Sequence, residues 1–445
     1  MTDDEQAVAP NASCPILKIS RGEDAASALR SRSVLQSGRL WAAALRDDDE
    51  VAQAAYHDFI HDVFTFSNGD THRGRRKQLN TLVRPEAIDR IRDEIVAPQA
   101  RSLLSRLATG PHPDGKYRLD LNVLGYRTFL HFTAQFIGFV GVETDEQMQR
   151  LAACVFPLSA AIASAFYKER AEIIASAQEA KKRYVEDFYI PARDAARVTL
   201  DDLRAGRLSA DQVPPSFMHL VVSGGHEDWQ DEELAIRDSI LLFAASVGSS
   251  AQAVVHAVHG LSKWFAEHPE DLAYRTDHDF LMCALQESVR LHSPFSPYVT
   301  RVAGHGALID GDAVELGRMM RIYVPTASRD PELWGADSHE FNPRRPVPEG
   351  WHRHGLGFSA GAHQCLGQRV VVGGDGTGGA HVRLLQALYE AGVAPDPDNP
   401  PKTVERTPGG DPEEVDVERW MSYPVVLNEL PADVPAAPVS AEAGG

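Results

Sequence analysis

One cysteine lies in a stretch whose residue types suit the binding of a metal-containing group. Residues 358–367 read FSAGAHQCLG, with the cysteine at position 365. A thiol binds metal as the thiolate, and the amide donors and positive end of a helix beginning just after Cys365 would stabilise that form. Gly361 and Gly367 have no side chains, so the backbone could approach the bound group closely. The pattern therefore predicts that Cys365 is a ligand.

Four interpretations of Cys365 compete. A buried structural cysteine is common in general, but a loop with flanking Gly and His is unlike a core position. A nucleophile activated by His363 requires two side chains to face each other, which is rare for residues two apart in a tight loop. Structural zinc sites normally close two separated ligand pairs, whereas the candidate zinc ligands here would be His352, His354, His363 and Cys365. The fourth interpretation is thiolate ligation of haem iron.

Two further pairs of charged residues stand at helical spacing before the cysteine stretch. His72 and Arg76 are four apart in a basic run at the start of a predicted helix, so they share one face. A basic run is usually a solvated surface. Glu287 and Arg290 are three apart on a predicted helix, and by spacing alone they would form an ordinary surface ion pair. Loops reading RDP at 329–331 and FNPRR at 341–345 follow.

The order of these motifs resembles that of the cytochrome P450 family. The two charged pairs, the RDP and FNPRR loops and the FxxGxHxC signature around Cys365 follow one another as they do in that family. From about residue 20 to residue 428, the chain resembles a soluble, bacterial-type member. The resemblance implies a haem b cofactor whose iron takes the Cys365 thiolate as its axial ligand. It also implies a long helix across the distal face of the haem.

The resemblance further implies roles for individual residues. Phe358 would shield the sulfur, and buried charge-assisted partners would hold the two haem propionates. These partners would be His72, Arg76, Arg301 and His363, while Gly367 and Ala245 complete the expected cofactor-binding set. A buried network of Glu287, Arg290 and Arg345, rather than Arg344, would position the cysteine loop.

The long helix predicted at residues 231–267 has a weak middle, which permits either close helix packing or a groove for a ligand. Most members of the family that this chain resembles have an Ala-Gly-x-acid-Thr pattern in this helix. The acid and the alcohol of that pattern relay protons during dioxygen activation. This chain reads ASVGS at 245–249, and glycine cannot replace a carboxylate. The alcohol remains as a serine, and neighbouring serines could hold water. The candidate catalytic positions are therefore Ser249, Gly248, Ser246 and Ser250.

The remaining pattern predicts an α+β fold that is mostly α. Helical periodicity runs through residues 23–45, 50–63, 88–107, 124–142, 145–196, 280–292 and 380–391. Short strand-like runs at 298–303, 307–309, 313–316 and 320–325 place a small β portion late in the chain. This segregation argues against alternating βαβ units. The GxGxxG match at Gly374, Gly376 and Gly379 lacks the βαβ context that dinucleotide binding requires.

Composition limits the compartment and the partners. The formal net charge of −19 disfavours duplex nucleic acid and anionic membrane surfaces. Four scattered cysteines favour a reducing compartment, and neither a signal peptide nor a run of about 20 apolar residues is evident, which predicts a cytoplasmic protein. We expect disordered tails at 1–15 and 430–445 and a single haem domain, monomeric, at 16–429.

Three functions follow from these expectations. The first is oxidative tailoring of a small, largely hydrophobic molecule in secondary metabolism. Its electrons would come from a separate ferredoxin and ferredoxin reductase, because no flavin or iron–sulfur domain is evident. The alternative is atypical chemistry that does not need the acid–alcohol relay, such as peroxide-driven oxidation, nitrene transfer, rearrangement or dehydration. The third is a non-catalytic haem sensor.

Overall fold

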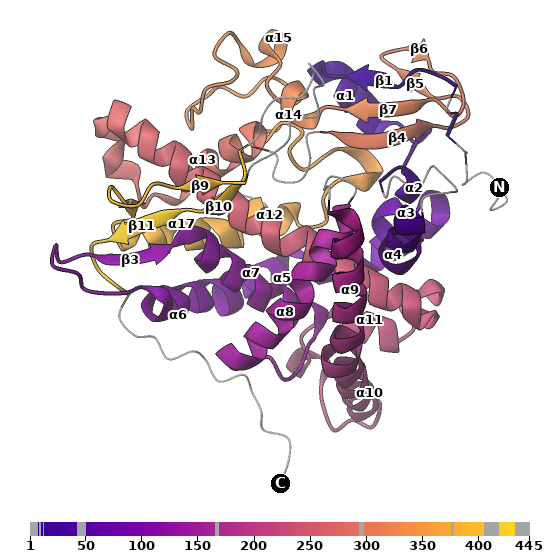
Figure 1. Ribbon diagram of the computed structural model, residues 1–445, viewed down its shortest axis with the longest axis horizontal. Coiled ribbons are helices and arrows are strands. Elements are labelled where there is room, and N and C mark those ends of the chain that lie inside the picture. The colour runs from indigo at the N-terminus through magenta and orange to yellow at the C-terminus, as the bar shows by residue number, and fades with distance from the viewer. Residues whose placement is uncertain are drawn as a thin grey trace.

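The fold is built around α12 (Glu232–Glu267), a single helix of 36 residues that lies near the centre of the molecule (Figure 1). The computed structural model describes residues 8, 10–11, 13–41, 50–164, 169–292, 298–374, 378–404 and 418–431. At about 1.5 Å per residue, α12 spans roughly 54 Å. The Asp231 carboxylate caps it by accepting the Glu233 amide at 3.0 Å. Among the described helices, α12 alone has the length and composition to cross a membrane, but 67% of its apolar window is buried inside the protein.

Two hydrophobic clusters divide α12 between them. Its first half, from Ala235 to Val247, packs with α8–α10, whereas its second half, from Ala253 to Phe265, packs with α6, α7, α13 and α17. The glycine- and serine-containing middle of the helix, noted in the sequence, lies where these two clusters meet. Close packing also occurs there, since a Cβ on Gly125 of α7 would lie 3.0 Å from the Ala251 Cα of α12.

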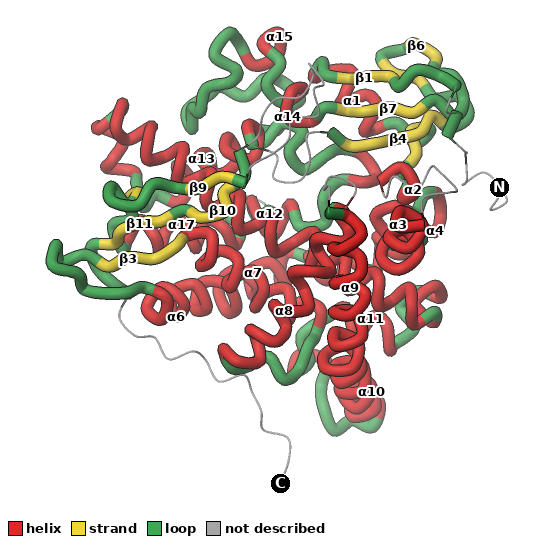
Figure 2. The backbone as a smooth tube through the Cα atoms, viewed as in Figure 1, coloured by secondary structure: helices red, strands yellow, loops and turns green. Residues whose placement is uncertain are grey.

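The helices surround α12 on several sides and form the bulk of the molecule, as Figure 2 shows in red. The α-helices are α1 (Gly22–Arg30), α2 (Gly38–Trp41), α3 (Glu50–Ala55), α4 (Gly69–Leu79), α5 (Pro85–Arg90), α6 (Ala97–Leu107), α7 (Leu121–Ile137), α8 (Asp145–Ile162), α9 (Arg170–Tyr184), α10 (Ile190–Arg204), α11 (Phe217–Val222), α13 (His278–Leu291), α14 (Val324–Ala327), α15 (Pro331–Trp334), α16 (Gln368–Val372) and α17 (Ala380–Glu390). Short 3-10 or π-helical turns join several of them, including Tyr56–Ile60, Phe64–Phe66, Asn80–Val83 and Glu227–Gln230.

The strands form small sheets at the edge of this helical body. A four-stranded sheet has the order β1-β7-β4-β2, a three-stranded sheet the order β3-β11-β8, and two pairs join β5 to β6 and β9 to β10. The strands are β1 (Leu17–Ile19), β2 (Val34–Leu35), β3 (Tyr117–Asp120), β4 (Val299–Ala303), β5 (Leu308–Ile309), β6 (Asp312–Ala313), β7 (Met319–Ile322), β8 (Ala394–Pro395), β9 (Lys402–Thr403), β10 (Trp420–Ser422) and β11 (Pro424–Leu427). The α+β, mostly α class is confirmed.

The expectation that all strands come late was wrong. Strand β1 near the N-terminus runs parallel to β7, with Leu17 opposite Met320, and β2 pairs antiparallel with β4. A run of two or three residues carries no alternation long enough to predict a strand, so only the long-range pairing identifies it. The GxGxxG glycines have no strand before them in the described part, since Gly374 follows helix α16 and Gly376 lies outside it.

Two predicted helices were too long. Residues 23–45 do not form one helix, because α1 ends at Arg30 and Ser31 takes extended φ and ψ angles of −69° and 128°. That change of direction brings β2 against β4. The helix predicted for 145–196 breaks after Ile162, and residues 165–168 lie outside the described part of the chain. Most of the two predicted tails, and residues 42–49, also lie outside it.

Candidate functional site

Cys365 lies in a tight loop that ends where α16 begins at Gln368. Its amide donates a 2.8 Å hydrogen bond to the carbonyl of Phe358, which closes the loop. Gly361 has a φ of +71°, and a Cβ there would lie only 2.5 Å from the Leu29 carbonyl oxygen. The first of the two glycines therefore lets the loop pass close to α1 rather than approach the sulfur. Gly367 does face the sulfur, since its Cβ would lie 3.8 Å from Cys365 Sγ.

The Cys365 thiol is desolvated yet accessible. Burial raises the pKa of the thiol, against the opposing effects of the Gly367 and Gln368 amides and the Arg76 guanidinium. The side chain nevertheless keeps a large exposed fraction, while Phe358 nearby is almost fully buried. A thiol in this position stays protonated in the protein alone, and a bound cation is what would convert it to thiolate.

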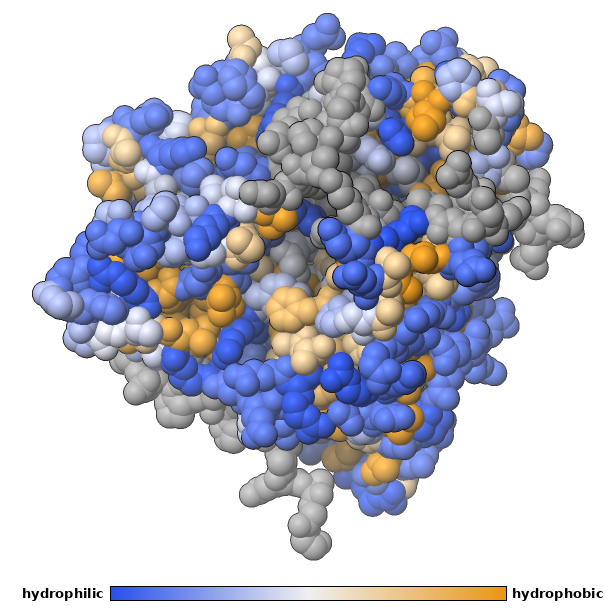
Figure 3. All heavy atoms as spheres, in the orientation of Figure 1, coloured by the Kyte–Doolittle hydropathy of each residue, from blue (hydrophilic) through white to orange (hydrophobic). Residues whose placement is uncertain are grey.

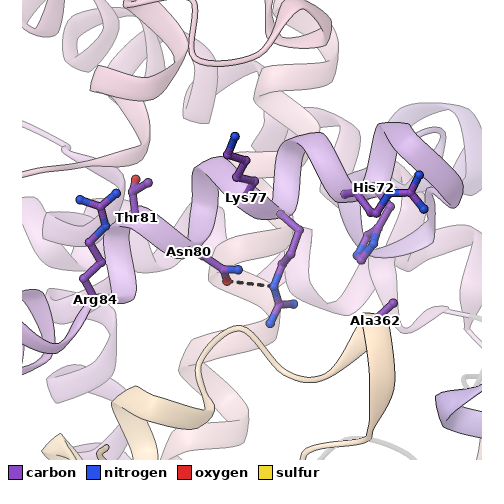
Figure 4. A pocket seen from close by; sticks show the side chains of 8 residues that line it. His72, Lys77, Asn80, Thr81, Arg84 and Ala362 are labelled. Carbon is purple, nitrogen blue, oxygen red and sulfur yellow. Dashed lines mark hydrogen bonds between the residues drawn. The ribbon is translucent and has the colours of Figure 1, made fainter.

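Four cationic or potentially cationic side chains come together beside this loop. His72 and Arg76 project from one face of α4, and the ring of His72 lies 4.0 Å from that of His363. Arg76 Nη1 donates to the Gln364 carbonyl at 2.6 Å. Figure 4 shows His72 turned toward the loop that carries Ala362, whereas Lys77 points to the other side of α4. Arg301 comes from β4, is 6% exposed, and lies close enough for its charge to act on His363.

The electrostatics of this cluster favour an anion. Burial, then the neighbouring positive groups, lowers the pKa of His363 to about 2 and that of His72 to about 4. Burial also lowers the pKa of Arg301 to about 10. Among the residues that the structure describes, no carboxylate forms an ion pair with Arg76 or Arg301, and the buried Nδ1 of His363 has no hydrogen-bond partner.

A buried group of cations without a carboxylate partner is costly unless a ligand supplies the negative charge. The two propionates of a haem would supply carboxylates to these donors, and the Cys365 thiol lies within the electrostatic reach of Arg76. The residues present therefore fit a haem group. A loop cysteine beside a buried cationic pocket is the arrangement that a haem-thiolate site requires.

Glu287, Arg290 and Arg345 form a buried network behind the loop. Arg290 binds both carboxylate oxygens of Glu287 at 2.8 Å, and Arg345 Nε binds the same carboxylate at 3.0 Å. Neither Glu287 nor Arg290 is exposed. Arg344 instead pairs with Asp271, with N–O distances of 2.6 and 2.9 Å. Arg290 also donates to the carbonyls of Ser328 and Ser338, so the network ties three loops to α13.

The middle of α12 presents few polar groups to open space. Ala245 is exposed although most of the helix is buried, and a Cβ on Gly248 would meet nothing within 4 Å. Ser249 lies on the same face and donates its hydroxyl to the Ala245 carbonyl at 2.5 Å. The other two serines, Ser246 and Ser250, pack inside the protein. Ser246 bonds Thr133 of α7 at 2.5 Å, and Ser250 is 8% exposed.

The rival interpretations of Cys365 find no support in the geometry. No group of three or more His, Cys, Asp or Glu side chains converges within the described ranges, which removes the zinc cluster. His352 and His354 stack on each other, and His354 Nε2 accepts from Gln368 rather than approaching Cys365. The ring of His363 packs at a tilt against that of His72, with centroids 4.0 Å apart, so it is not placed as a base for the thiol.

Some features of the site were not predicted. A cleft of about 600 Å³ runs along α4, and Figure 4 shows the side chains that line it. The lining residues are His72, Arg73, Arg76, Lys77, Asn80, Thr81, Arg84 and Ala362. The basic run could have indicated the cleft, since His72 and Arg76 face the loop and Arg73 and Lys77 are exposed, whereas Arg75 is buried against Asp228. The contact of Thr133 with Ser246 left no sequence signal.

Known proteins agree with this geometry. A family model described as cytochrome P450 matches residues 270–370, which include Glu287, Arg290 and Cys365. Putative cytochrome P450 126 of Mycobacterium tuberculosis is 29% identical over 156 residues, 35% of this chain and 36% of the relative. Putative cytochrome P450 140 of Mycobacterium bovis is 30% identical over 159 residues, 35% of this chain and 34% of the relative. These matches span about a third of the relatives' length.

Solved structures match over nearly the whole chain. CalO2 has a TM-score of 0.65 at 16% identity, covering 96% of this chain and 93% of its own. Ligand-free CYP164A2 of Mycobacterium smegmatis has a TM-score of 0.61 at 18% identity, with coverage of 92% and 90%. CxnD, described as the enzyme for C–S bond formation in chuangxinmycin biosynthesis, has a TM-score of 0.64 at 14% identity, with coverage of 93% and 88%. Over residues 270–370 the chain is therefore similar to the cytochrome P450 family, and its overall fold is similar to those of these solved structures.

Proposed function

We propose that this chain is a haem-thiolate oxidoreductase of the monooxygenase type that carries out oxidative tailoring of a small, largely hydrophobic molecule in secondary metabolism. The observation that carries the proposal is the buried, carboxylate-free cluster of Arg76, Arg301 and His363 beside an accessible Cys365 thiol. Such a cluster needs an anionic ligand, and the thiol needs a cation.

In this proposal a single domain at residues 16–429 holds haem b. Cys365 would hold the iron through its thiolate, and Phe358 would limit the access of water to the sulfur. Arg76, Arg301, His72 and His363 would bind the propionates, and Gly367 and Ala245 would complete the cofactor-binding set. Bound haem supplies one-electron and dioxygen chemistry. Glu287, Arg290 and Arg345 keep the cysteine loop in place.

The substrate would occupy the space next to Ala245, Gly248 and Ser249. Apart from the Ser249 hydroxyl, which is already bonded, this face offers no polar group, so it suits an apolar substrate. An exposed aromatic, Phe156, stacks on Tyr126 with ring centroids 4.4 Å apart. Biosynthetic relatives such as CxnD support a role in the making of a secondary metabolite.

The electron donor would be a separate ferredoxin, reduced by a ferredoxin reductase. The outer half of the α4 cleft carries Arg73, Lys77 and Arg84, which form a basic surface on a protein of net charge −19. A small acidic electron carrier fits that surface, because opposite charges steer association. We place the enzyme, as a monomer, in the cytoplasm, with neither nucleic acid nor membrane as partner.

A second candidate function rests on Gly248. The family's acid is missing at this position, and the nearest hydroxyl, on Ser249, points back to its own helix. Chemistry without the acid–alcohol relay is therefore the alternative, and it includes peroxide-driven oxidation, nitrene transfer, rearrangement and dehydration. Ser246 is hydrogen-bonded to Thr133 and Ser250 is buried, so neither is placed to supply the relay directly.

Turnover of candidate apolar substrates separates the two functions. The protein is assayed with NAD(P)H, ferredoxin and its reductase, and in parallel with hydrogen peroxide alone. We expect product with the electron-transfer chain. Product with peroxide alone would replace the first function by the second. Before either assay, the reduced, carbon-monoxide-bound protein should show the red-shifted absorption band of a thiolate-ligated haem.

A further inference from the structure

Three buried charged side chains hold one short stretch of backbone ahead of α4. The stretch is residues 61–64, between the π-helical turn Tyr56–Ile60 and the 3-10 turn Phe64–Phe66. Arg237 Nε donates to the His61 carbonyl at 3.0 Å, Arg75 Nη1 donates to the Asp62 carbonyl at 2.5 Å, and Asp238 Oδ1 accepts the Phe64 amide at 2.8 Å. Every one of these contacts joins a side chain to the backbone.

Asp238 is the centre of this arrangement. It is fully buried, and its second oxygen accepts the indole N–H of Trp229 at 2.8 Å. Arg75 Nη1 lies 3.9 Å from the same oxygen. The carboxylate therefore joins α12, the turn Glu227–Gln230, the 61–64 stretch and α4.

Arg75 connects the arrangement to the haem site. It is 3% exposed and lies on α4 immediately before Arg76, with its Nε bonded to Asp228 at 2.6 Å. Asp62, whose carbonyl it binds, has a φ of +57°, a backbone conformation that persists only when its surroundings hold it. Neither Arg75 nor Asp62 faces Cys365 among the described contacts, so their influence on the cofactor must pass through α4.

We propose that Arg75, Arg237 and Asp238 form a clamp on residues 61–64 that positions α4, and with it His72 and Arg76, for binding the haem propionates. The inference rests on the proposed function, because it assigns these residues a role in holding the cofactor. They are positioning residues, since none of them is expected to touch the haem.

The first test is Asp238→Asn in the full-length protein. One carboxylate oxygen becomes an NH₂ group, which must face either the Phe64 amide or the Trp229 indole, both of which are donors. We expect the affinity of the haem-free protein for added haemin to fall about tenfold, as the loss of one hydrogen bond to a charged group implies. Hydrogen exchange at the Phe64 amide should become faster before any haem is added.

A second variant tests the hydrogen-bond geometry directly. Trp229→Phe removes the indole donor. In the double variant, the amide oxygen of the asparagine introduced by D238N is therefore free to accept the Phe64 amide, while its NH₂ group meets an aromatic ring. We expect D238N/W229F to bind haemin more tightly than D238N. An additive double-mutant cycle, with no such recovery, contradicts the clamp.

The matched control is Asp271→Asn at the other end of α12. Asp271 also accepts an indole N–H, from Trp264 at 2.8 Å, and also pairs with an arginine, Arg344. It makes no contact with α4 in the described part of the chain. We expect D271N to bind haemin like the unmodified protein. Equal weakening by D271N and D238N would mean general destabilisation and would overturn the proposal.

The proposed function and the clamp can be disproved separately. If the unmodified protein binds no haem through Cys365, the proposed function is wrong, and this appears in the first titration without any variant. If it binds haem but D238N binds equally well with unchanged exchange at Phe64, the clamp is wrong and the proposed function stands.

Discussion

The two faces of the proposed haem site are constructed in opposite ways. The cysteine face is crowded with charge: Arg76, Arg301, His72 and His363 converge beside the loop, and Glu287 and Arg290 lie fully buried behind it. The α12 face shows Ala245, Gly248 and a single Ser249 hydroxyl that bonds its own helix. Buried charge tolerates little change because each group depends on its partners, whereas an apolar, open helix face can vary without unfolding the protein.

This contrast separates cofactor binding from substrate chemistry. The charged face brings together the residues that the family motifs single out, His72, Arg76, Arg301 and His363. The open face departs from the family at Gly248, and it is the face that a substrate would contact. Figure 3 shows that the surface in this view is mostly hydrophilic, with apolar side chains gathered left of centre.

Replacing Cys365 should have the largest effect. Cys365→Ala removes the proposed iron ligand, so we expect complete loss of the red-shifted absorption band of the reduced, carbon-monoxide-bound protein. Cys283→Ala is the control, because Cys283 is also a free, partly exposed cysteine but lies on α13. An unchanged band in Cys365→Ala would show that Cys365 does not bind the iron, and the comparison between a cysteine face and an α12 face would no longer hold.

Breaking the buried network should have the next largest effect. Arg290→Met leaves the Glu287 carboxylate without its bidentate partner, and we expect the free energy of unfolding to fall by about 3–5 kcal/mol. Asp194 and Arg197 form the same kind of pair at the same spacing, 3.1 Å apart but exposed. Arg197→Met should therefore lower that free energy by less than about 1 kcal/mol. Urea denaturation followed by circular dichroism measures both, and equal losses would contradict the prediction.

The third prediction concerns pH and the charged end of α12. Burial raises the pKa of Asp238 to about 6, although Arg75, Trp229, the Phe64 amide and Arg237 act in the opposite direction. The folded chain then keeps this proton up to about pH 6, while the unfolded chain releases it near pH 4. The contribution of Asp238 to the free energy of unfolding should therefore decrease as pH rises through this window, by about 3 kcal/mol.

Asp238→Asn removes this titration. The difference in unfolding free energy between the unmodified protein and the variant should change by most of that amount from about pH 4 to about pH 7, as measured by denaturation at each pH. A constant difference across the window would mean that the Asp238 pKa is not raised.

The smallest effect is expected on the open face. Gly248→Ala places a methyl group where nothing lies within 4 Å, in the middle of a helix. Alanine is favoured over glycine there by about 1 kcal/mol, so the thermal unfolding temperature should rise. The same substitution at Gly125 would meet Ala251 at 3.0 Å and should destabilise instead. A loss of stability in Gly248→Ala would show that the face is not open.

Several parts of the molecule could be predicted from the sequence because they depend on local chemistry. The helix predicted at 231–267 corresponds to α12 within one residue, since its apolar periodicity extends over many turns. The spacing of His72 and Arg76 correctly placed them on one helical face. The prediction of a single helix at residues 23–45 was wrong, because a serine-rich break and a two-residue strand carry too little local signal.

Other parts depended on contacts between distant segments. The clamp joins residues 61–64 to residues 237 and 238, and nothing local in either segment indicates the other. The sequence offers the Ser246 hydroxyl for proton transfer, but in the structure it is hydrogen-bonded to Thr133 of α7, which is distant in the chain.

The sequence by itself determined the candidate ligand, Cys365, and the residue types needed around it, because a thiolate and two carboxylates require particular partners. Only the tertiary structure decided which of these partners meet. Arg301 stands far from Arg76 in the chain, and they approach the same loop because the pairing of β4 in its sheet and the packing of α4 bring them there. Side-chain chemistry is a local property, whereas a buried charge cluster exists only where separate elements pack together.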